Sequence, residues 1–273
     1  MRGSLSIRRV LGILGWPRSS HYAAPRQQSV VDESLAKAVH AIHHASGRTF
    51  GARRMSHALR RRGFDVGRDR AAVTMQRLDL TLRTKRYKHY TRNTKPAPAL
   101  NILNRQFDPA GANEAWAGDV TYLPTQQGWL YLAIVVDLFS RRVIGWATSH
   151  VADTRLALAA SELAFATRRP KPGLIVHTDQ GCQYTADLFV AHLAEHGAVQ
   201  SMSRKGNCWD NAVVERVFRT LKHECLGEER LPREMTRVAV IDFLAGYYNH
   251  ERLHSTLNYL PPAEFETLAA QRS

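Results

Sequence analysis

The stretch AWAGDVTYLPTQQGWLYLAIVVDLFSRRVIGWATS, residues 115–149, decides the fold class of this chain. It contains three runs rich in Val, Ile, Tyr and Trp, at 115–124, 129–139 and 141–149, and short turns separate them. Runs of this composition between turns are typical of β-strands. Three such runs in succession predict an antiparallel meander.

Helices and further strands are expected after the meander. Residues 152–169 have a helical pattern, with Thr154 as the expected cap and Pro170 and Pro172 ending the helix. The remaining elements predicted in this half are strands at 173–179 and 198–203 and helices at 185–197 and 207–224. Strands mixed with helices in this way predict an α/β fold, in which a mixed sheet carries helices on its faces.

The N-terminal part has a helical pattern instead. Residues 33–46, 49–63 and 68–82 each place apolar side chains at helical spacing. The expected buried stripes are Leu35, Val39 and Ile42, then Met55 and Leu59, then Ala72, Met75, Leu78 and Leu82. The last two helices are joined by a turn around Gly63 and Gly67, which favours a helix-turn-helix module. A further helix is expected before Pro17.

Charge divides the chain in the same place. The chain of 273 residues has a net charge of +14. Residues 1–95 hold 21 Lys and Arg against 5 Asp and Glu, a net charge of +16, so residues 96–273 have a net charge of −2. Such a segment suits a nucleic-acid binder, because cations on it release counterions from phosphates. We therefore expect a basic, all-α DNA-binding region over 1–95, a linker to about residue 107 that begins in the basic run at 83–100, and a core over 108–273.

Basic side chains cluster at the turn of the expected helix-turn-helix. They are Arg60, Arg61, Arg62, Arg68 and Arg70. We expect them to contact backbone phosphates, the contacts that position a protein on DNA. A solvated basic face is the alternative, and no side chain in the module is identified as a reader of bases.

Several other classes of protein do not fit the sequence. The chain has no apolar run near the ~18 residues of a membrane span, and the N-terminal apolar stretch is interrupted by Gly12 and Gly15 without a cleavage site for a signal peptide. The three cysteines form no close pair, so neither a disulfide framework nor a thiolate zinc site is expected. A reducing cytoplasm fits best.

Three carboxylates on separate elements are candidate metal ligands. Asp119 lies in the first predicted strand and Asp179 ends the fourth, so the two face each other if these strands are neighbours. Glu215 shares a helix face with Arg219 and Lys222, away from the buried valines. Oxygen-rich sets of this kind bind Mg²⁺ or Mn²⁺, and two such ions can promote phosphodiester cleavage.

Asp137 is an equal candidate by composition alone, because it too ends an apolar strand. The alternative is a turn-initiating residue paired with Arg141 or Arg142. Buried carboxylates also occur simply as ion-pair partners, so the ligand set stays open at this point.

The runs WAGDVTYLP, YLAIVVDLFSRRVIGWA, HTDQGCQYT, SMSRKGNCWDNAVVERVFRTLKHE and YNHERLHSTLNYLPPAEF closely resemble bacterial insertion-sequence transposases. The class is the one whose second reading frame encodes a core like that of retroviral integrases. The likeness covers about residues 108–266, and a weaker one covers 30–82. The family's aspartate-aspartate-glutamate pattern has the same spacing, with 35 residues between Asp179 and Glu215 and a basic residue, Lys222, seven positions later.

This resemblance implies an RNase H-like core and a two-metal site formed by Asp119, Asp179 and Glu215. It also implies cleavage at the element's ends and strand transfer by the exposed 3′-hydroxyls. Asp137 falls outside the pattern. Phosphate contacts are expected from Lys222 and Arg219. The zinc-binding cluster of retroviral integrases is missing, because no cysteine precedes Cys182.

Other matched residues have two interpretations each. Arg204 and Lys205 are expected in a DNA-contacting loop, with a solvated basic turn as the alternative. His177 is expected to be a buried, hydrogen-bonded side chain. Trp209 and Asn211 either position the site or pack at the helix start. The C-terminal motif residues Tyr248, Asn249, Arg252 and His254 are expected to brace the fold.

Double-stranded DNA is the expected partner. Joining two ends requires at least two protomers, so we expect a homo-oligomer on DNA, and an upstream-frame protein or fusion is expected to supply further functions. A DNA-binding regulator would explain the basic segment but would leave the carboxylate motifs unused. A metal-dependent nuclease on the same fold, or an inactive transposase relic, would also account for the sequence.

Overall fold

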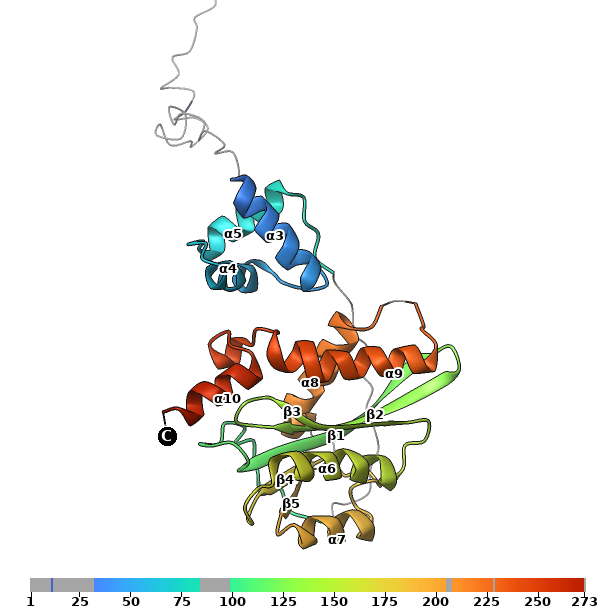
Figure 1. Ribbon diagram of the computed structural model, residues 1–273. Coiled ribbons are helices and arrows are strands. Elements are labelled where there is room, and N and C mark those ends of the chain that lie inside the picture. Colours follow the sequence, from blue (N-terminus) through green and yellow to red (C-terminus); the bar gives the residue numbers. More distant parts are fainter. Residues whose placement is uncertain (1–10, 12–31, 84–98, 205–207, 228, 273) are drawn as a thin grey trace, which may run out of the picture.

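The computed structural model describes residues 11, 32–83, 99–204, 208–227 and 229–272 (Figure 1). Its N-terminal helices are α3 (Glu33–Ala45), α4 (Ala52–Arg61) and α5 (Arg68–Arg77). The strands are β1 (Ala115–Thr125), β2 (Gly128–Asp137), β3 (Val143–Ser149), β4 (Ile175–Thr178) and β5 (Val199–Met202). The helices of the core are α6 (Thr154–Arg168), α7 (Asp187–Glu195), the 3₁₀ turn η1 (Cys208–Asn211), α8 (Ala212–Glu224), α9 (Arg233–Asp242), the π-helical η2 (Phe243–Tyr248), η3 (Ser255–Leu257) and α10 (Pro262–Ala270). The predicted helix before Pro17 and most of the linker lie outside the described residues.

The five strands form one mixed sheet with the order β3-β2-β1-β4-β5. β1, β2 and β3 pair antiparallel, which confirms the predicted meander. β4 pairs parallel with β1 on one side and with β5 on the other. The expectation that the first and fourth strands are neighbours is therefore confirmed.

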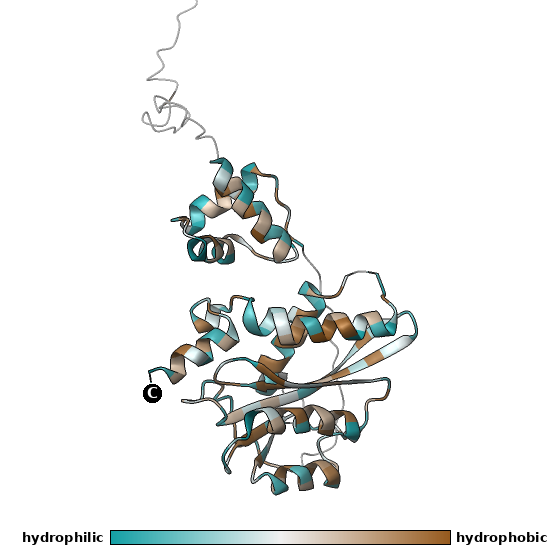
Figure 2. Cartoon of the chain, in the orientation of Figure 1, coloured by the Kyte–Doolittle hydropathy of each residue, from teal (hydrophilic) through white to brown (hydrophobic). Residues whose placement is uncertain are grey.

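Helices cover both faces of the sheet. Figure 1 shows α6 and α7 on one face and α8 and α9 on the other. Because side chains alternate along a strand, Ala115, Ala117 and Leu123 of β1 pack in the hydrophobic cluster that contains α8 residues, whereas Trp116 packs with α6 and α7. Figure 2 shows hydrophobic residues concentrated in the sheet and hydrophilic ones along α4.

Two glycines allow close geometry in the meander. Gly128 adopts a φ of 97° where the β1–β2 turn enters β2, a conformation that glycine reaches without steric cost. A Cβ on Gly145 of β3 would lie 2.1 Å from the carbonyl oxygen of Ala160, so α6 packs directly on the strand backbone. Both positions therefore require glycine.

Three local predictions are corrected by the structure. The N-cap of α6 is Asp153, whose Oδ1 accepts the Leu156 N–H at 3.0 Å, and not Thr154. In α5 the buried side is formed by Ala71 and Met75, while Ala72 is exposed. Leu82 lies beyond the end of that helix and is also exposed. The predicted cap at Gly63 is confirmed by its φ of 86°.

The N-terminal helices have their own hydrophobic cluster. It includes Leu253, which belongs to the C-terminal segment, defined here as the described residues after η2 (249–272). The rings of His57 and Tyr259 stack 3.8 Å apart and add a second contact to that segment. Whether these helices fold and bind DNA independently of the sheet stays a prediction. None of the helices formed by the described residues combines the length and apolar character that crossing a bilayer requires.

Candidate active site

The register of β1 and β4 brings two aspartates together. The parallel pairing runs from Ala115 with Ile175 to Ala117 with His177. Two residues beyond the last pair, each chain segment carries an aspartate, Asp119 on β1 and Asp179 just after β4. By the alternation of β1, Asp119 lies on the face of the sheet that α8 covers.

The two aspartates line the same small cavity, together with Tyr184. Burial raises the pKa of Tyr184 well above its ordinary value, and the charges of Asp119 and Asp179 raise it further. A Cβ added to Gly118 would lie 3.7 Å from the phenol oxygen, so the hydroxyl sits against β1 beside Asp119. Both carboxylates therefore act electrostatically on one buried phenol, which stays protonated at neutral pH.

The turn after β4 fixes the side chain of Asp179. Its Oδ1 accepts the backbone N–H of Gly181 at 2.9 Å. A Cβ on Gly181 would lie only 2.9 Å from the same oxygen, so a larger residue there would disturb this hydrogen bond. On β1, Asp119 Oδ1 accepts the N–H of Val120 at 2.7 Å.

Glu215 lies on the face of α8 that follows β1. At the start of this helix Asn211 Nδ2 donates to the carbonyl of Gly118 at 3.2 Å, and near its end Lys222 Nζ donates to Thr121 Oγ1 at 2.6 Å. Positions 211, 215 and 222 are four and seven residues apart and share one helix face. The contacted residues, Gly118 and Thr121, lie on either side of Asp119 in β1. Glu215 therefore lies on the side of α8 that faces this part of β1.

The three carboxylates do not form a closed ligand set in this structure. Among the described residues, no group of three or more His, Cys, Asp or Glu side chains is arranged to hold a metal ion. Glu215 is exposed and is not part of the cavity lined by Asp119 and Asp179. The donor chemistry nevertheless fits a hard divalent cation, since all three side chains supply oxygen.

The two cations predicted to contact phosphate flank this face of α8. The Lys222 ammonium lies 5.2 Å from the ring centroid of Tyr122, besides its hydrogen bond to Thr121. Arg219, one turn after Glu215, is exposed and lines a second, larger cavity. Both side chains are therefore near the candidate site, on different sides of the helix face.

Arg204 has a partner that the sequence did not indicate. Its guanidinium binds the fully buried carboxylate of Asp210, with Nε–Oδ2 and Nη2–Oδ1 distances of 2.9 Å. Arg105 and Asn101 donate to the same carboxylate. The hydrogen bonds from Arg204, against the opposing effect of burial, hold the pKa of Asp210 well below its usual range. Arg204 thus anchors the turn before α8, and Lys205 lies outside the described residues.

His177 is a structural histidine, as expected. Its ring nitrogens lie 2.9 Å from Ser201 Oγ and 3.1 Å from Ser203 Oγ, and its side chain is fully buried. Burial lowers its pKa to about 4, so the ring is neutral at physiological pH. At the start of α8, Asn211 is buried, whereas Trp209 is exposed and does not pack into the core.

Asp137 is a buried ion-pair residue, but its predicted partners were wrong. It pairs with Arg168 of α6 at 3.2 Å and accepts the backbone N–H groups of Asn113 and Phe139, both at 2.9 Å. Burial raises the pKa of Asp137, against the opposing hydrogen bond from Asn113 and charge of Arg168. Arg141 instead binds Asp108, and Arg142 binds Glu266.

Asp137→Asn is expected to lower the free energy of unfolding by about 2 kcal/mol, because one buried hydrogen-bond donor loses its charged acceptor. Any DNA-joining activity per folded molecule should be unchanged. Urea unfolding and an activity measurement normalised to the folded fraction test both points. Complete inactivity of a folded variant would make Asp137 a candidate ligand again.

The basic turn of the N-terminal helices is only partly available to DNA. Arg60, Arg62 and Arg68 are exposed. Arg61 instead forms a two-pronged ion pair with Glu264 of α10, with distances of 3.0 and 2.6 Å. This bond raises the pKa of the Arg61 guanidinium, against the opposing effect of burial. Arg61 therefore connects the helices to the C-terminal segment.

The C-terminal motif braces the fold, as predicted. Asn249 donates to the carbonyl of Val143 at 2.9 Å and accepts its N–H at 3.0 Å. Arg252 binds Glu224, the last residue of α8, through two hydrogen bonds of 2.8 Å. Sequence analysis missed Glu224, because its two partners, Arg252 and Arg54, are distant in the chain.

Comparison with known proteins finds matches over most of the chain. Models of the integrase core domain match residues 109–208 and 196–262, and a model of an HTH-like domain matches residues 31–88. The transposase for insertion sequence element IS904 of Lactococcus lactis subsp. lactis is 37% identical over 245 residues, which cover 89% of this chain and 97% of that protein. Transposase InsF for insertion sequence IS3A of Escherichia coli is 40% identical over 226 residues, 81% of this chain and 78% of that protein. Among solved structures, the HTLV-2 integrase catalytic core domain in complex with magnesium matches with 19% identity and a TM-score of 0.46, covering 57% of this chain and 98% of that one.

Proposed function

Because the chain belongs to the insertion-sequence transposases with an integrase core, we propose that it cleaves DNA at the ends of an insertion sequence and joins them to a target. Asp119, Asp179 and Glu215 are the proposed catalytic carboxylates. The supporting observation is the β1–β4 register, which carries Asp119 and Asp179 to one cavity on the sheet. The contacts of Asn211 and Lys222 with β1 support Glu215 as the third member.

A divalent cation suits this set of side chains. Carboxylate oxygens from a strand, a strand end and a helix would leave ligand positions for water and substrate phosphate, as Mg²⁺ prefers. Two bound ions would supply a lowered pKa for the attacking hydroxyl and charge stabilisation for the leaving oxygen. Closing the set would bring the Glu215 carboxylate together with the two aspartates, on a helix that Asn211 and Lys222 already hold against β1.

The other side chains of the site prepare it for a phosphodiester. Tyr184 stays protonated at neutral pH, so it adds no negative charge beside the aspartates. Lys222 and Arg219 provide positive charge on either side of Glu215, where they would hold the phosphates that flank the reacting one. Strand joining by this route forms one P–O bond for each that breaks and releases one strand end, so it needs no external energy source.

The remaining parts of the proposal concern assembly. Exposed arginines of the N-terminal helices, Arg60, Arg62 and Arg68, are proposed to position the chain on double-stranded DNA. Two ends must be handled together, so we propose a homo-oligomer on DNA. An upstream-frame protein or fusion is proposed to contribute to the recognition of ends, and a reducing cytoplasm is the proposed compartment.

The first test is a strand-joining assay with the full chain, labelled DNA that carries the ends of its own element, and a plasmid target. Joined products are expected with Mg²⁺ or Mn²⁺. Removing the metal with EDTA should abolish joining, and adding Mg²⁺ back should restore it, since the carboxylates alone cannot stabilise the leaving oxygen. Gel analysis of both DNA strands measures the outcome.

Competing functions would give different products. Metal-dependent cutting without joining would identify a nuclease on the same fold. Metal-independent binding as the sole activity would favour a regulator or an inactive relic. Repeating the assay with the upstream frame fused to the chain separates a missing partner from a lost activity, because only the former is rescued.

A further inference from the structure

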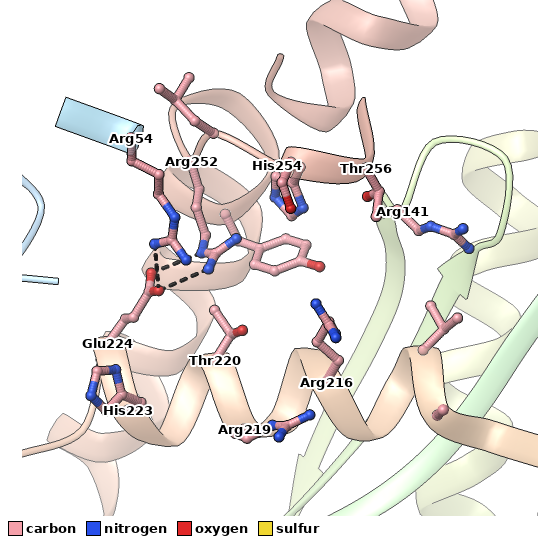
Figure 3. A pocket seen from close by; sticks show the side chains of 15 residues that line it. Arg54, Arg141, Arg216, Arg219, Thr220, His223, Glu224, Arg252, His254 and Thr256 are labelled. Carbon is pink, nitrogen blue, oxygen red and sulfur yellow. Dashed lines mark hydrogen bonds and ion pairs between the residues drawn. The ribbon is translucent and has the colours of Figure 1, made fainter. Parts of the chain in front are cut away.

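A second and larger cavity, of about 690 Å³, lies between α4, the side of α8 next to Glu215, and the C-terminal segment (Figure 3). The charged residues that line it are mostly positive. The five arginines of the lining are Arg54, Arg141, Arg216, Arg219 and Arg252, against a single carboxylate, Glu224. A concave surface with this surplus of positive charge attracts anions.

The one carboxylate is fully engaged by two of the arginines. Glu224 binds Arg54 at 3.1 Å and Arg252 at 2.8 Å, as the dashed lines in Figure 3 show. Arg141 is held by the carbonyl of Phe107 and by Asp108 outside the cavity. The negative charge of Glu224 is therefore taken up by Arg54 and Arg252, and the lining as a whole stays positive.

Arg216 is the side chain best placed to meet a ligand. It is exposed on α8, and within the described part of the chain it has neither a hydrogen bond nor an ion pair. Figure 3 shows its guanidinium rising from α8 toward His254, and Tyr248 lines the same cavity. The planar fork of an arginine suits phosphate oxygens in particular.

The opposite wall carries an unpartnered polar atom. His254 is only 7% exposed, and its Nε2 has no hydrogen-bond partner among the described residues. Buried polar atoms are nearly always satisfied, so such an atom on a cavity wall marks a place for a bound polar group. The hydroxyls of Thr220 and Thr256 line the same cavity and can donate hydrogen bonds to phosphate oxygens, whereas His254 Nε2 can accept one from a bound water.

We infer that this cavity binds the phosphodiester backbone of the DNA strand whose end reacts at Glu215. The inference rests on the proposed function. Arg219, at its border, is four residues from Glu215, a rise of ~6 Å along α8, so the bound phosphates belong to nucleotides close to the reacting one. Because Arg54 belongs to α4, a DNA strand bound in the cavity would contact both the N-terminal helices and α8, the helix that carries Glu215.

The test compares Arg216→Ala with Arg155→Ala, an exposed arginine of α6 on the other face of the sheet. Affinity for DNA ends is measured over a range of salt concentrations. Arg216→Ala is expected to bind about tenfold more weakly, with a salt slope shallower by about one, because one phosphate contact is lost. Arg155→Ala should keep the wild-type affinity and slope, and thermal unfolding should show both variants folded.

Substituting single phosphates with uncharged methylphosphonates locates the contact. One substitution within a few nucleotides of the reacting 3′ end should weaken binding by the wild type and not by Arg216→Ala. Equal affinities and slopes for the two arginine variants, in a protein whose wild type joins DNA, would overturn the inference and leave the proposed function intact. If the wild type does not join DNA but Arg216→Ala still weakens binding to DNA ends as expected, the result would support the phosphate-binding cavity and count against the proposed joining activity.

Discussion

Glu215→Gln is expected to abolish strand joining while leaving the affinity for DNA ends unchanged. The substitution replaces a proposed metal-binding carboxylate with a neutral amide. Removing a residue that only hydrogen-bonds to a metal ligand already costs up to about 100-fold in activity, so the joining rate should fall by more than this. Glu215 is exposed and is not a member of the hydrophobic core, so the amide should be accommodated without loss of stability. Joining is measured under single-turnover conditions, and affinity by titration in the presence of Ca²⁺.

The controls separate ligand loss from a general effect of charge. Asp179→Asn should behave like Glu215→Gln, because both remove a member of the same set. Glu195→Gln, an exposed glutamate of α7 on the other face of the sheet, should join at the wild-type rate. Calorimetric titration with Mn²⁺ should show weaker binding in the first two variants alone. Wild-type joining by Glu215→Gln would mean that the third ligand comes from elsewhere.

The sheet was predictable because its pattern is local. The three strand runs over 115–149 are dense in β-branched and aromatic residues, and their turns are short enough to fix antiparallel pairing. The parallel pairing of β1 with β4 does not follow from a local pattern, since β4 comes about 60 residues later in the chain, after α6. The meeting of Asp119 and Asp179 was therefore predicted only on the condition that these two strands are neighbours, and the family resemblance implied the same pair.

Partners of buried charges could not be predicted, because they are chosen in three dimensions. Asp137 is close in sequence to Arg141 and Arg142 but is paired with Arg168, which α6 brings across the sheet. Asp210, just before α8, is bound by Arg204 and by Arg105, which comes about 100 residues earlier in the chain. In both cases a fully buried carboxylate is paired with an arginine, as the cost of burying an unpaired charge requires. Arg168 is itself largely buried, whereas Arg204 reaches Asp210 from a side chain that is half exposed.

The same limitation hid the ion pair that connects three separate parts of the chain. Glu224 ends α8, Arg252 belongs to the C-terminal motif and Arg54 to α4. The side chains of Glu224 and Arg252 are 5% and 9% exposed. Burial alone would raise the pKa of Glu224, but the hydrogen bonds and charge of Arg252, with those of Arg54, lower it overall. The ionised carboxylate therefore stabilises the folded chain.

Glu224→Gln is accordingly expected to lower the free energy of unfolding by about 3–5 kcal/mol, because it leaves Arg252 buried without a counter-charge. Urea unfolding measures the loss. Glu234→Gln is the matched control, since that side chain is 72% exposed, and its pair with Arg237 should contribute no more than about 1 kcal/mol. The double variant Glu224→Gln with Arg252→Gln should lose less than the sum of the single losses, as expected for residues in contact.

The pH dependence of this loss follows from the lowered pKa of Glu224. A carboxylate whose pKa is lower in the folded state contributes its full stability above its unfolded value of about 4.3, and that contribution disappears as the pH falls through the folded value. The difference between wild type and Glu224→Gln should thus be constant from pH 8 to about pH 5 and shrink in more acidic solution. A difference that grew on acidification would contradict the assignment, because it would require that protonated Glu224 be the stabilising form.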